Sequence, residues 1–374
     1  MLAAMAPLLL LLACSAGADD SGATSDGGAD DTGEPLTPQQ QVAALDAPGA
    51  WAVGYTEQQV DYTDPAGQPR SLRLAAWYPS TDTDGEGVEY LGIVEDELSW
   101  RDATVAPGPF PVIVFSHGSQ GYAEVGGFLM RHLASHGWLV LSPDHTDNLI
   151  TDGGQRSTEI YFQRPADISA VLDHAAAAWA GTADLDVVVG VGHSFGGYTL
   201  HALAGATYAI EDLAPACYDG SDTSDFCSTM TPAFQAIFAA GLRDDRIDTI
   251  LPVGAGDLRL FTEEGIVTID RPAMWMSGEL EGANAEAEQI FGVMADGVDR
   301  RVEVAGAGHN WLLDLSASLD LDATLDTEQG WRIARVYTLA WARRHGLGDT
   351  QVDVVLDGQV EVDAAARLMT GAAR

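Results

Sequence analysis

Apolar residues follow two alternating patterns through the middle of this chain. Short runs rich in β-branched residues predict strands that are buried on both faces, because such side chains fit a covered, pleated surface. Longer segments with apolar residues at helical spacing lie between several of these runs. The predicted strands cover residues 70–79, which enter the sheet antiparallel, and then 110–115, 138–145, 187–191, 247–253, 272–277 and 301–304.

The predicted helices cover residues 126–136, 166–180, 198–204, 285–295 and 327–345. Alternating strands and helices indicate an α/β domain in which a mostly parallel central sheet has helices on both faces. At 374 residues the chain has room for one large domain of this kind plus appendages. We assign this catalytic domain to residues 48–374. Reacting groups in such a domain are expected at the carboxyl ends of the strands.

The first residues predict export. Residues 1–13 are apolar but too few to span a bilayer, and they lead into Leu11-Leu12-Ala13-Cys14, which resembles the lipobox of bacterial lipoprotein signal peptides. We therefore expect a signal peptide over 1–13 and lipidation of Cys14; an ordinary secretory signal is the alternative. Residues 14–47, rich in small and acidic residues, predict a disordered linker. The protein would be a membrane-anchored lipoprotein of the cell envelope or a secreted protein.

The charge of the chain limits its partners. The formal net charge is −38, and all 18 basic residues are arginine. An acidic surface repels nucleic acid and anionic lipid headgroups, so a nucleic-acid role is excluded. We expect a monomer that reaches a membrane only through its N-terminal lipid.

Residues 208–243 interrupt the alternating pattern as an insertion. They contain Cys217 and Cys227, and in an exported protein two cysteines that close a short loop favour a disulfide over two free thiols. The insertion is expected over the active site, where it would act as a lid or as a wall for substrate.

The strongest chemical signal is Gly192-His193-Ser194-Phe195-Gly196. It follows the valine strand 187–191 and precedes the helix 198–204. A strand-to-helix turn this tight forces a strained backbone on its central residue, and the flanking glycines leave room for neighbouring backbone. This pattern is typical of the nucleophile elbow of serine hydrolases, with Ser194 as the nucleophile.

A serine nucleophile needs a general base, and that base needs an acid. His309 follows the last predicted strand among glycines and alanines, and the order Ser, acid, His suits this fold. For the acid we favour Glu281, with Glu279 second and Asp257 third, since each follows a predicted strand. Two other histidines flank the proposed site and are expected to hold loop geometry, namely His117 and His193. The remaining histidines, apart from His145 at the end of a strand, lie on predicted helices: His132, His136, His174, His201 and His345.

The developing oxyanion needs backbone N–H donors. We expect one from Phe195, the residue after the nucleophile, and a second from Ser119, with Gln120 as the alternative. Both alternatives follow His117-Gly118 in the loop after strand 110–115. No Cys and His cluster in the sequence has metal-ligand spacing, and no phosphate-binding glycine loop carries a lysine. We therefore predict no metal and no cofactor.

Four motifs carry a family resemblance: residues 114–119, 142–145, 192–197 and 307–309. They resemble the α/β-hydrolase branch that contains platelet-activating-factor acetylhydrolases, predicted dienelactone hydrolases, chlorophyllases and cutinase-like polyester hydrolases. The resemblance implies a carboxylic ester hydrolase that works through an acyl-serine intermediate. By position, Ser194, His309, Phe195 and Ser119 carry over, whereas relatives usually have Asp where Glu281 stands.

The sequence thus predicts a serine esterase acting on a small-molecule or lipid ester. Two alternatives stay open. One is a lipase-like or acetylhydrolase-like enzyme for lipid or polyester substrates, and the other is a non-catalytic, surface-tethered binding protein on a hydrolase scaffold.

Overall fold

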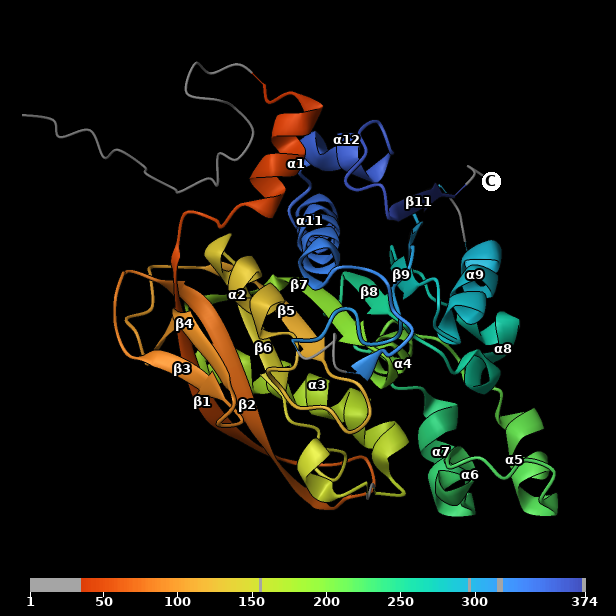
Figure 1. The fold of residues 1–374 in the computed structure, drawn as a ribbon. Coiled ribbons are helices and arrows are strands. Elements are labelled where there is room, and N and C mark those ends of the chain that lie inside the picture. The colour runs from red at the N-terminus through yellow and green to blue at the C-terminus, as the bar shows by residue number, and fades with distance from the viewer. Residues whose placement is uncertain (1–34, 155–156, 295–296, 315–318, 372–374) are drawn as a thin grey trace, which may run out of the picture.

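A single twisted sheet runs through the domain, with helices packed on both of its faces (Figure 1). The computed structural model describes residues 35–154, 157–294, 297–314 and 319–371. The strand order is β11-β10-β9-β8-β7-β5-β6-β2-β1-β4-β3. The strands are β1 Ala52–Thr63, β2 Pro69–Ser80, β3 Gly87–Tyr90, β4 Val94–Arg101, β5 Phe110–Ser116, β6 Leu139–Pro143, β7 Ala183–His193, β8 Thr249–Val253, β9 Met274–Gly278, β10 Arg300–Val304 and β11 Ala366–Thr370.

The centre of the sheet, from β6 through β10, is parallel, and β2 joins it antiparallel as the sequence predicted. The helices are α1 Pro38–Asp46, α2 Gly127–Ser135, α3 Ile160–Ala178, α4 Phe195–Leu203, α5 Ile210–Asp219, α6 Phe226–Thr229, α7 Pro232–Ala240, α8 Leu258–Ile266, α9 Ala283–Met294, α11 Thr327–Gly346 and α12 Asp353–Leu356, with short 3-10 turns at Ile150–Asp152 and Thr350–Val352.

Two hydrophobic cores lie on opposite faces of the sheet because successive side chains of a strand point to opposite sides. Along β5, Val112 and Val114 enter one core, whereas Ile113 and Phe115 enter the other. The first core is covered by α3, α4, α8, α9 and the insertion, and the second by α1, α2, α11 and α12. These four side chains are fully buried, so the carboxyl end of β5 is held firmly where the loop to Ser119 begins.

The folded part of the chain begins earlier than the sequence analysis predicted. We had placed residues 38–46 in a disordered linker, but they form α1, which packs on α11 and α12. The helix begins with a capping box between Thr37 and Gln40, and its Val42 and Leu45 are buried. That prediction was wrong because the small and acidic residues further upstream dominated the composition. Residues 1–34, with the predicted signal peptide and Cys14, lie outside the described part.

Four strands were not predicted, namely β1, β3, β4 and β11. β1 pairs with β2 along its whole length and with β4 in parallel, and β11 adds an antiparallel edge beside β10. Polar residues occupy many positions of these strands, since they lie toward the edges of the sheet and face solvent on one side. Their hydrophobic signal is correspondingly weak.

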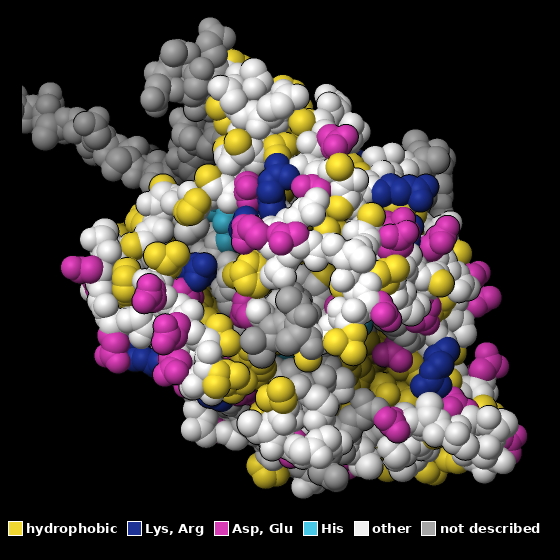
Figure 2. Space-filling model, in the orientation of Figure 1, with side chains coloured by type: hydrophobic (Ala, Val, Ile, Leu, Met, Phe, Trp, Pro, Cys, Tyr) yellow, Lys and Arg dark blue, Asp and Glu magenta, His cyan; other side chains and the backbone are white. Residues whose placement is uncertain are grey.

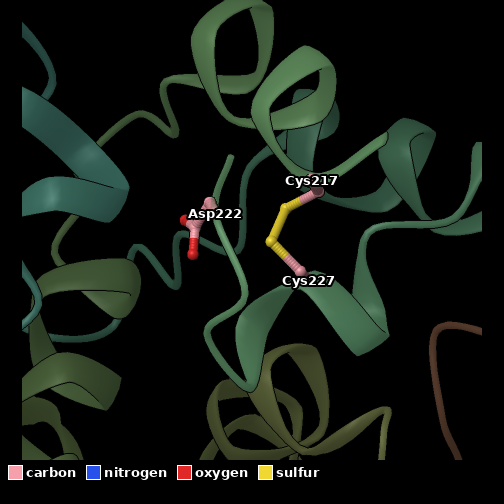
Figure 3. Close-up of side chains that lie close together, drawn as sticks. All are labelled: Cys217, Asp222 and Cys227. Atoms are coloured by element: carbon pink, nitrogen blue, oxygen red, sulfur yellow. A yellow bond between two sulfur atoms is a disulfide. The ribbon is translucent and has the colours of Figure 1, made fainter. Parts of the chain in front are cut away.

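The insertion forms α5, α6 and α7 beside α3 (Figure 1). The predicted disulfide between Cys217 and Cys227 is present and ties α5 to α6 (Figure 3). The ring of Phe226 packs edge-on against the ring of Tyr161. The Tyr161 ring in turn packs against the ring of Phe195, the residue after Ser194. The insertion therefore supports the site through these aromatic contacts, while its role as a lid stays a prediction.

Acidic side chains are scattered over the face shown in Figure 2, and several arginines lie beside them. On α11, for example, Arg335 donates to Asp46 of α1, and Arg343 pairs with Asp349. Among the described helices, none has the length and apolar character needed to cross a membrane.

Candidate active site

Ser194 lies at the sharp turn between β7 and α4. Its backbone has φ 54° and ψ −118°, a strained conformation for a residue with a side chain, and its N–H donates to Val253 O at 2.8 Å. The turn requires the glycines around it. A Cβ at Gly196 would lie 1.8 Å from the carbonyl oxygen of Ser116, and one at Gly192 would lie 2.5 Å from that of Gly196. The geometry is that of a nucleophile elbow.

His309 joins Ser194 to Glu281 in one chain of hydrogen bonds. The Oγ of Ser194 lies 2.8 Å from Nε2 of His309, and Nδ1 of His309 lies 2.5 Å from Oε2 of Glu281. The other carboxylate oxygen of Glu281 accepts the N–H of Gly278 at 2.6 Å. With a proton on Nδ1, His309 presents the unprotonated Nε2 to the serine hydroxyl, which is the tautomer a general base needs.

Electrostatics favour the charged state of this histidine. The hydrogen bond to Glu281 raises the pKa of His309, and burial opposes that rise. Burial raises the pKa of the Glu281 carboxyl, whereas the bonds from His309 and the Gly278 N–H lower it. The Glu281 side chain is almost fully buried, and the His309 ring is 38% exposed. The buried acid thus stabilises the imidazolium that forms when His309 accepts a proton.

The two other carboxylates considered from the sequence lie elsewhere. Glu279 Oε2 accepts the N–H of Gly306 at 2.9 Å, so it supports the loop that leads to His309. Asp257 occupies the N-cap position of α8 with a φ of 74°. The structure brings Glu281, the favoured residue of the three, to the imidazole.

The predicted oxyanion donors flank Ser194. Phe195 is the first residue of α4, so its N–H is at the helix N-terminus. On the other side, a Cβ added to Gly118 would lie 3.2 Å from Cβ of Ser194, which places the following Ser119 beside the nucleophile. Ser119 and Gln120 form the centre of a turn that Gly121 N–H closes onto Gly118 O at 3.1 Å, and Gln120 has a φ of 58°.

Two histidines hold these loops in place. The buried His117 donates through Nδ1 to Gly118 O at 2.7 Å and accepts the His145 N–H at Nε2 at 3.0 Å. Burial lowers its pKa well below the usual range, and the N–H that Nε2 accepts requires a neutral ring. His193 donates through Nε2 to the backbone oxygen of His309 at 2.8 Å, and burial lowers its pKa to about 3. Both contacts agree with the loop-holding role that the sequence suggested.

Two residues that were not predicted from the sequence lie beside His309 or the residue after it. Gly254 follows β8 with a φ of 58°, and a Cβ there would lie 2.7 Å from Oε2 of Glu281 and 3.2 Å from the His309 ring. Asp320 accepts both the backbone N–H of Asn310, at 2.6 Å, and its side-chain amide, at 2.8 Å. Gly254 could have been suspected from its place at a strand end. Asp320 carried no signal among so many acidic residues.

A hollow of about 720 Å³ lies away from these residues, between β1, α3 and residues 241–243. None of its lining residues belongs to the Ser194, His309 and Glu281 group, so the hollow is separate from that group.

Within the described ranges, one group of metal-ligating residue types comes together, formed in the insertion by Cys217, Asp222 and Cys227 (Figure 3). Both sulfur atoms belong to the disulfide, which removes the thiolates that would bind a metal. The group therefore does not fit a metal site.

Comparisons with known proteins agree with this geometry. A sequence model of the chlorophyllase family matches residues 103–232, which include Ser119 and Ser194. The structure of a ferulic acid esterase from Streptomyces cinnamoneus superposes with a TM-score of 0.59 at 18% identity, covering 82% of this chain and 93% of that one. The chain has the α/β-hydrolase fold, and it is similar in sequence to esterases and acetylhydrolases.

The chain is also similar to two curated proteins. It is 25% identical over 142 residues to platelet-activating factor acetylhydrolases from Canis lupus familiaris and from Bos taurus. Each match covers 31% of the chain and 30% of the relative. The chain thus matches less than a third of those enzymes, and the similarity supports the type of chemistry rather than a shared substrate.

Proposed function

We propose that the chain is a serine-dependent carboxylic ester hydrolase that works through an acyl-serine intermediate. The observation that carries the proposal is the continuous hydrogen-bonded chain from Ser194 Oγ through His309 to the buried Glu281. The likeness to esterases and acetylhydrolases supports the same reaction type.

In the acylation step, Ser194 Oγ attacks the ester carbonyl while its proton moves to Nε2 of His309. The negative charge that develops on the carbonyl oxygen is stabilised by the N–H groups of Phe195 and Ser119, a contribution worth about 3–4 kcal/mol for each donor. The imidazolium is stabilised by Glu281 and donates its proton to the departing alkoxide. The C–O bond to the alcohol breaks, and an acyl-serine is left.

In the deacylation step the roles repeat with water as the nucleophile. His309 accepts a proton from water, the resulting hydroxide attacks the acyl carbonyl, and the same N–H donors hold the oxyanion. The proton then returns to Ser194 Oγ and the acid is released.

The similar proteins are named for different substrates, and together they support ester hydrolysis as the shared reaction.

The test is hydrolysis of p-nitrophenyl esters of increasing acyl length by the purified chain and by Ser194→Ala. We expect the wild type to release p-nitrophenol with one preferred range of acyl length, and the variant to lose this activity by a factor of about 10³ or more. A Ser194→Ala protein that retains full activity would refute the serine mechanism. A folded wild type that hydrolyses none of the esters would favour a binding role.

A further inference from the structure

Behind the oxyanion loop lies an arginine that the catalytic steps do not use. Arg164, in the first part of α3, is fully buried. A buried guanidinium is costly unless its N–H groups are satisfied, so its partners show what it holds together.

Each arm of this guanidinium reaches one side of the site. Nη2 donates to the backbone oxygen of His117 and, at 3.2 Å, to Ser116 Oγ, both in the segment that leads to Ser119. Nη1 donates to Asn148 Oδ1 at 2.9 Å, and the amide of Asn148 donates to Ser119 Oγ at 3.2 Å. One oxyanion donor is therefore fixed to Arg164 through two routes.

The second donor is fixed to the same cation. The guanidinium carbon lies 4.7 Å from the centre of the Phe195 ring, within the range of a cation–π contact. Nε lies 3.3 Å from Thr199 Oγ1, and this hydroxyl donates to the backbone oxygen of Phe195 at 3.1 Å. Arg164 thus spans the gap between the two loops whose N–H groups would face the oxyanion.

A buried chain of side chains supports this arrangement from behind. Ser116 Oγ lies 2.9 Å from Nε2 of His145, and Nδ1 of His145 lies 2.8 Å from Asp167. Arg70 and Tyr62 donate to the same carboxylate at 2.6 and 2.5 Å. This Ser116–His145–Asp167 array has the order of a catalytic triad, but all three residues are fully buried.

We infer that Arg164 is a positioning residue for the oxyanion hole, fixing the Ser119 and Phe195 N–H groups at the spacing that the tetrahedral intermediate requires. The inference rests on the proposed esterase function. Small displacements of such donors are expensive, since a shift of about 1 Å can cost about 10²-fold in rate. A planar guanidinium can hold several acceptors in fixed directions, which an ammonium group cannot do.

The experiment compares Arg164→Gln and Arg164→Lys with the wild type, using p-nitrophenyl acetate and counting functional sites by the burst from diethyl p-nitrophenyl phosphate. We expect kcat per functional site to fall at least about tenfold in both variants while KM changes by less than about threefold. Affinity for a trifluoromethyl ketone, whose hemiketal oxyanion would occupy the hole, should weaken in proportion to kcat/KM.

The matched control is Arg335→Gln, which removes an arginine that pairs with Asp46 far from the loops. It should leave kcat per functional site and ketone affinity unchanged. A different result would overturn the inference. If the Arg164 variants have fewer functional sites but an unaltered kcat per site and ketone affinity, the role of Arg164 is purely structural.

If both Arg164 variants fail to fold, the same measurements are made on Asn148→Ala and Phe195→Leu. Each of these removes one contact of Arg164 and leaves the arginine in place, and the same changes in kcat per functional site and ketone affinity are expected. Failure of the proposed esterase function can be distinguished from failure of the inference about Arg164. In that case the wild type itself would hydrolyse no ester and react with no phosphate ester.

Discussion

The Oε2 atom of Glu281 lies 2.5 Å from Nδ1 of His309. Gly254 lies close to this carboxylate oxygen, and the N–H of Gly278 donates to the other one. This pair fixes the tautomer of the imidazole and presents Nε2 to Ser194. The arrangement of these residues therefore depends on a buried glutamate, on Gly254, which leaves room for its carboxylate, and on the Gly278 N–H, which donates to it.

The acid can be assigned by comparing Glu281→Gln with Glu279→Gln and Asp257→Asn. Because only Glu281 bonds to His309 among these three, we expect its variant to lose about 10³- to 10⁴-fold in kcat. The other two should stay within about threefold of wild type. The measurement is kcat on p-nitrophenyl acetate, and equal rates in all three variants would contradict the assignment.

The dependence of kcat/KM on pH should reflect the contact between His309 and Glu281. His309 must be neutral to accept the serine proton, so kcat/KM rises as pH passes its pKa. The hydrogen bond to Glu281 raises that pKa above the ordinary 6.5, so the midpoint of the acidic limb should lie above 6.5. In Glu281→Gln the midpoint should move to lower pH, because the carboxylate that favours the imidazolium is gone. Profiles from about pH 5 to 9 test this, and an unmoved midpoint would count against it.

A methyl group at Gly254 should damage the site without touching a reacting atom. In Gly254→Ala the new Cβ would lie 2.7 Å from Glu281 Oε2, at a backbone φ of 58°. We expect kcat to fall by about tenfold or more, because the acid and the imidazole must move apart. The control is Gly241→Ala, which has a φ of 77° with nothing within 4 Å of the added Cβ. It should lower stability alone, and an equal loss of kcat in both variants would argue against the contact.

The acidic surface should make stability depend on salt. With a net charge of −38, carboxylates repel one another in the folded state, and about 1 M salt shortens the screening length to about 3 Å. We expect Tm near neutral pH to rise by roughly 5 °C or more between low salt and 1 M NaCl. At about pH 4.5, where many carboxylates are protonated, the rise should be much smaller. A Tm that does not change with salt at neutral pH would contradict this prediction. It would show that ion pairs with arginine already offset the repulsion between the carboxylates.

The parts of the site that were predictable from sequence are those encoded locally. The valines of β7 and the glycines around Ser194 specify a buried strand and a tight turn within a few residues. His309 could be placed because its strand is short, alternates valines with charged residues and is followed by a loop of glycines and alanines. The favoured acid needed one further assumption, that a side chain deeper in the loop after β9 can turn back toward the imidazole.

The parts that were missed depend on contacts between distant segments. Arg164 lies 47 residues from its acceptor on His117, and nothing in the helical pattern of α3 distinguishes it from a surface arginine. The strands β1 and β4, which lie next to the β3 edge of the sheet, were also not predicted, because their mixed polarity reflects partial exposure. α1 was predictable in principle from its capping box, but the composition of the linker before it obscured the signal.

The central claim is that Ser194 is a nucleophile activated by His309. Its most direct test is covalent labelling with a fluorophosphonate, followed by mass spectrometry of the intact chain and of its peptides. We expect one phosphonyl group per chain, on the peptide that contains Ser194, with labelling lost in Ser194→Ala and greatly slowed in His309→Ala. A folded wild-type chain that takes up no label, or takes it up on another residue, would contradict the claim.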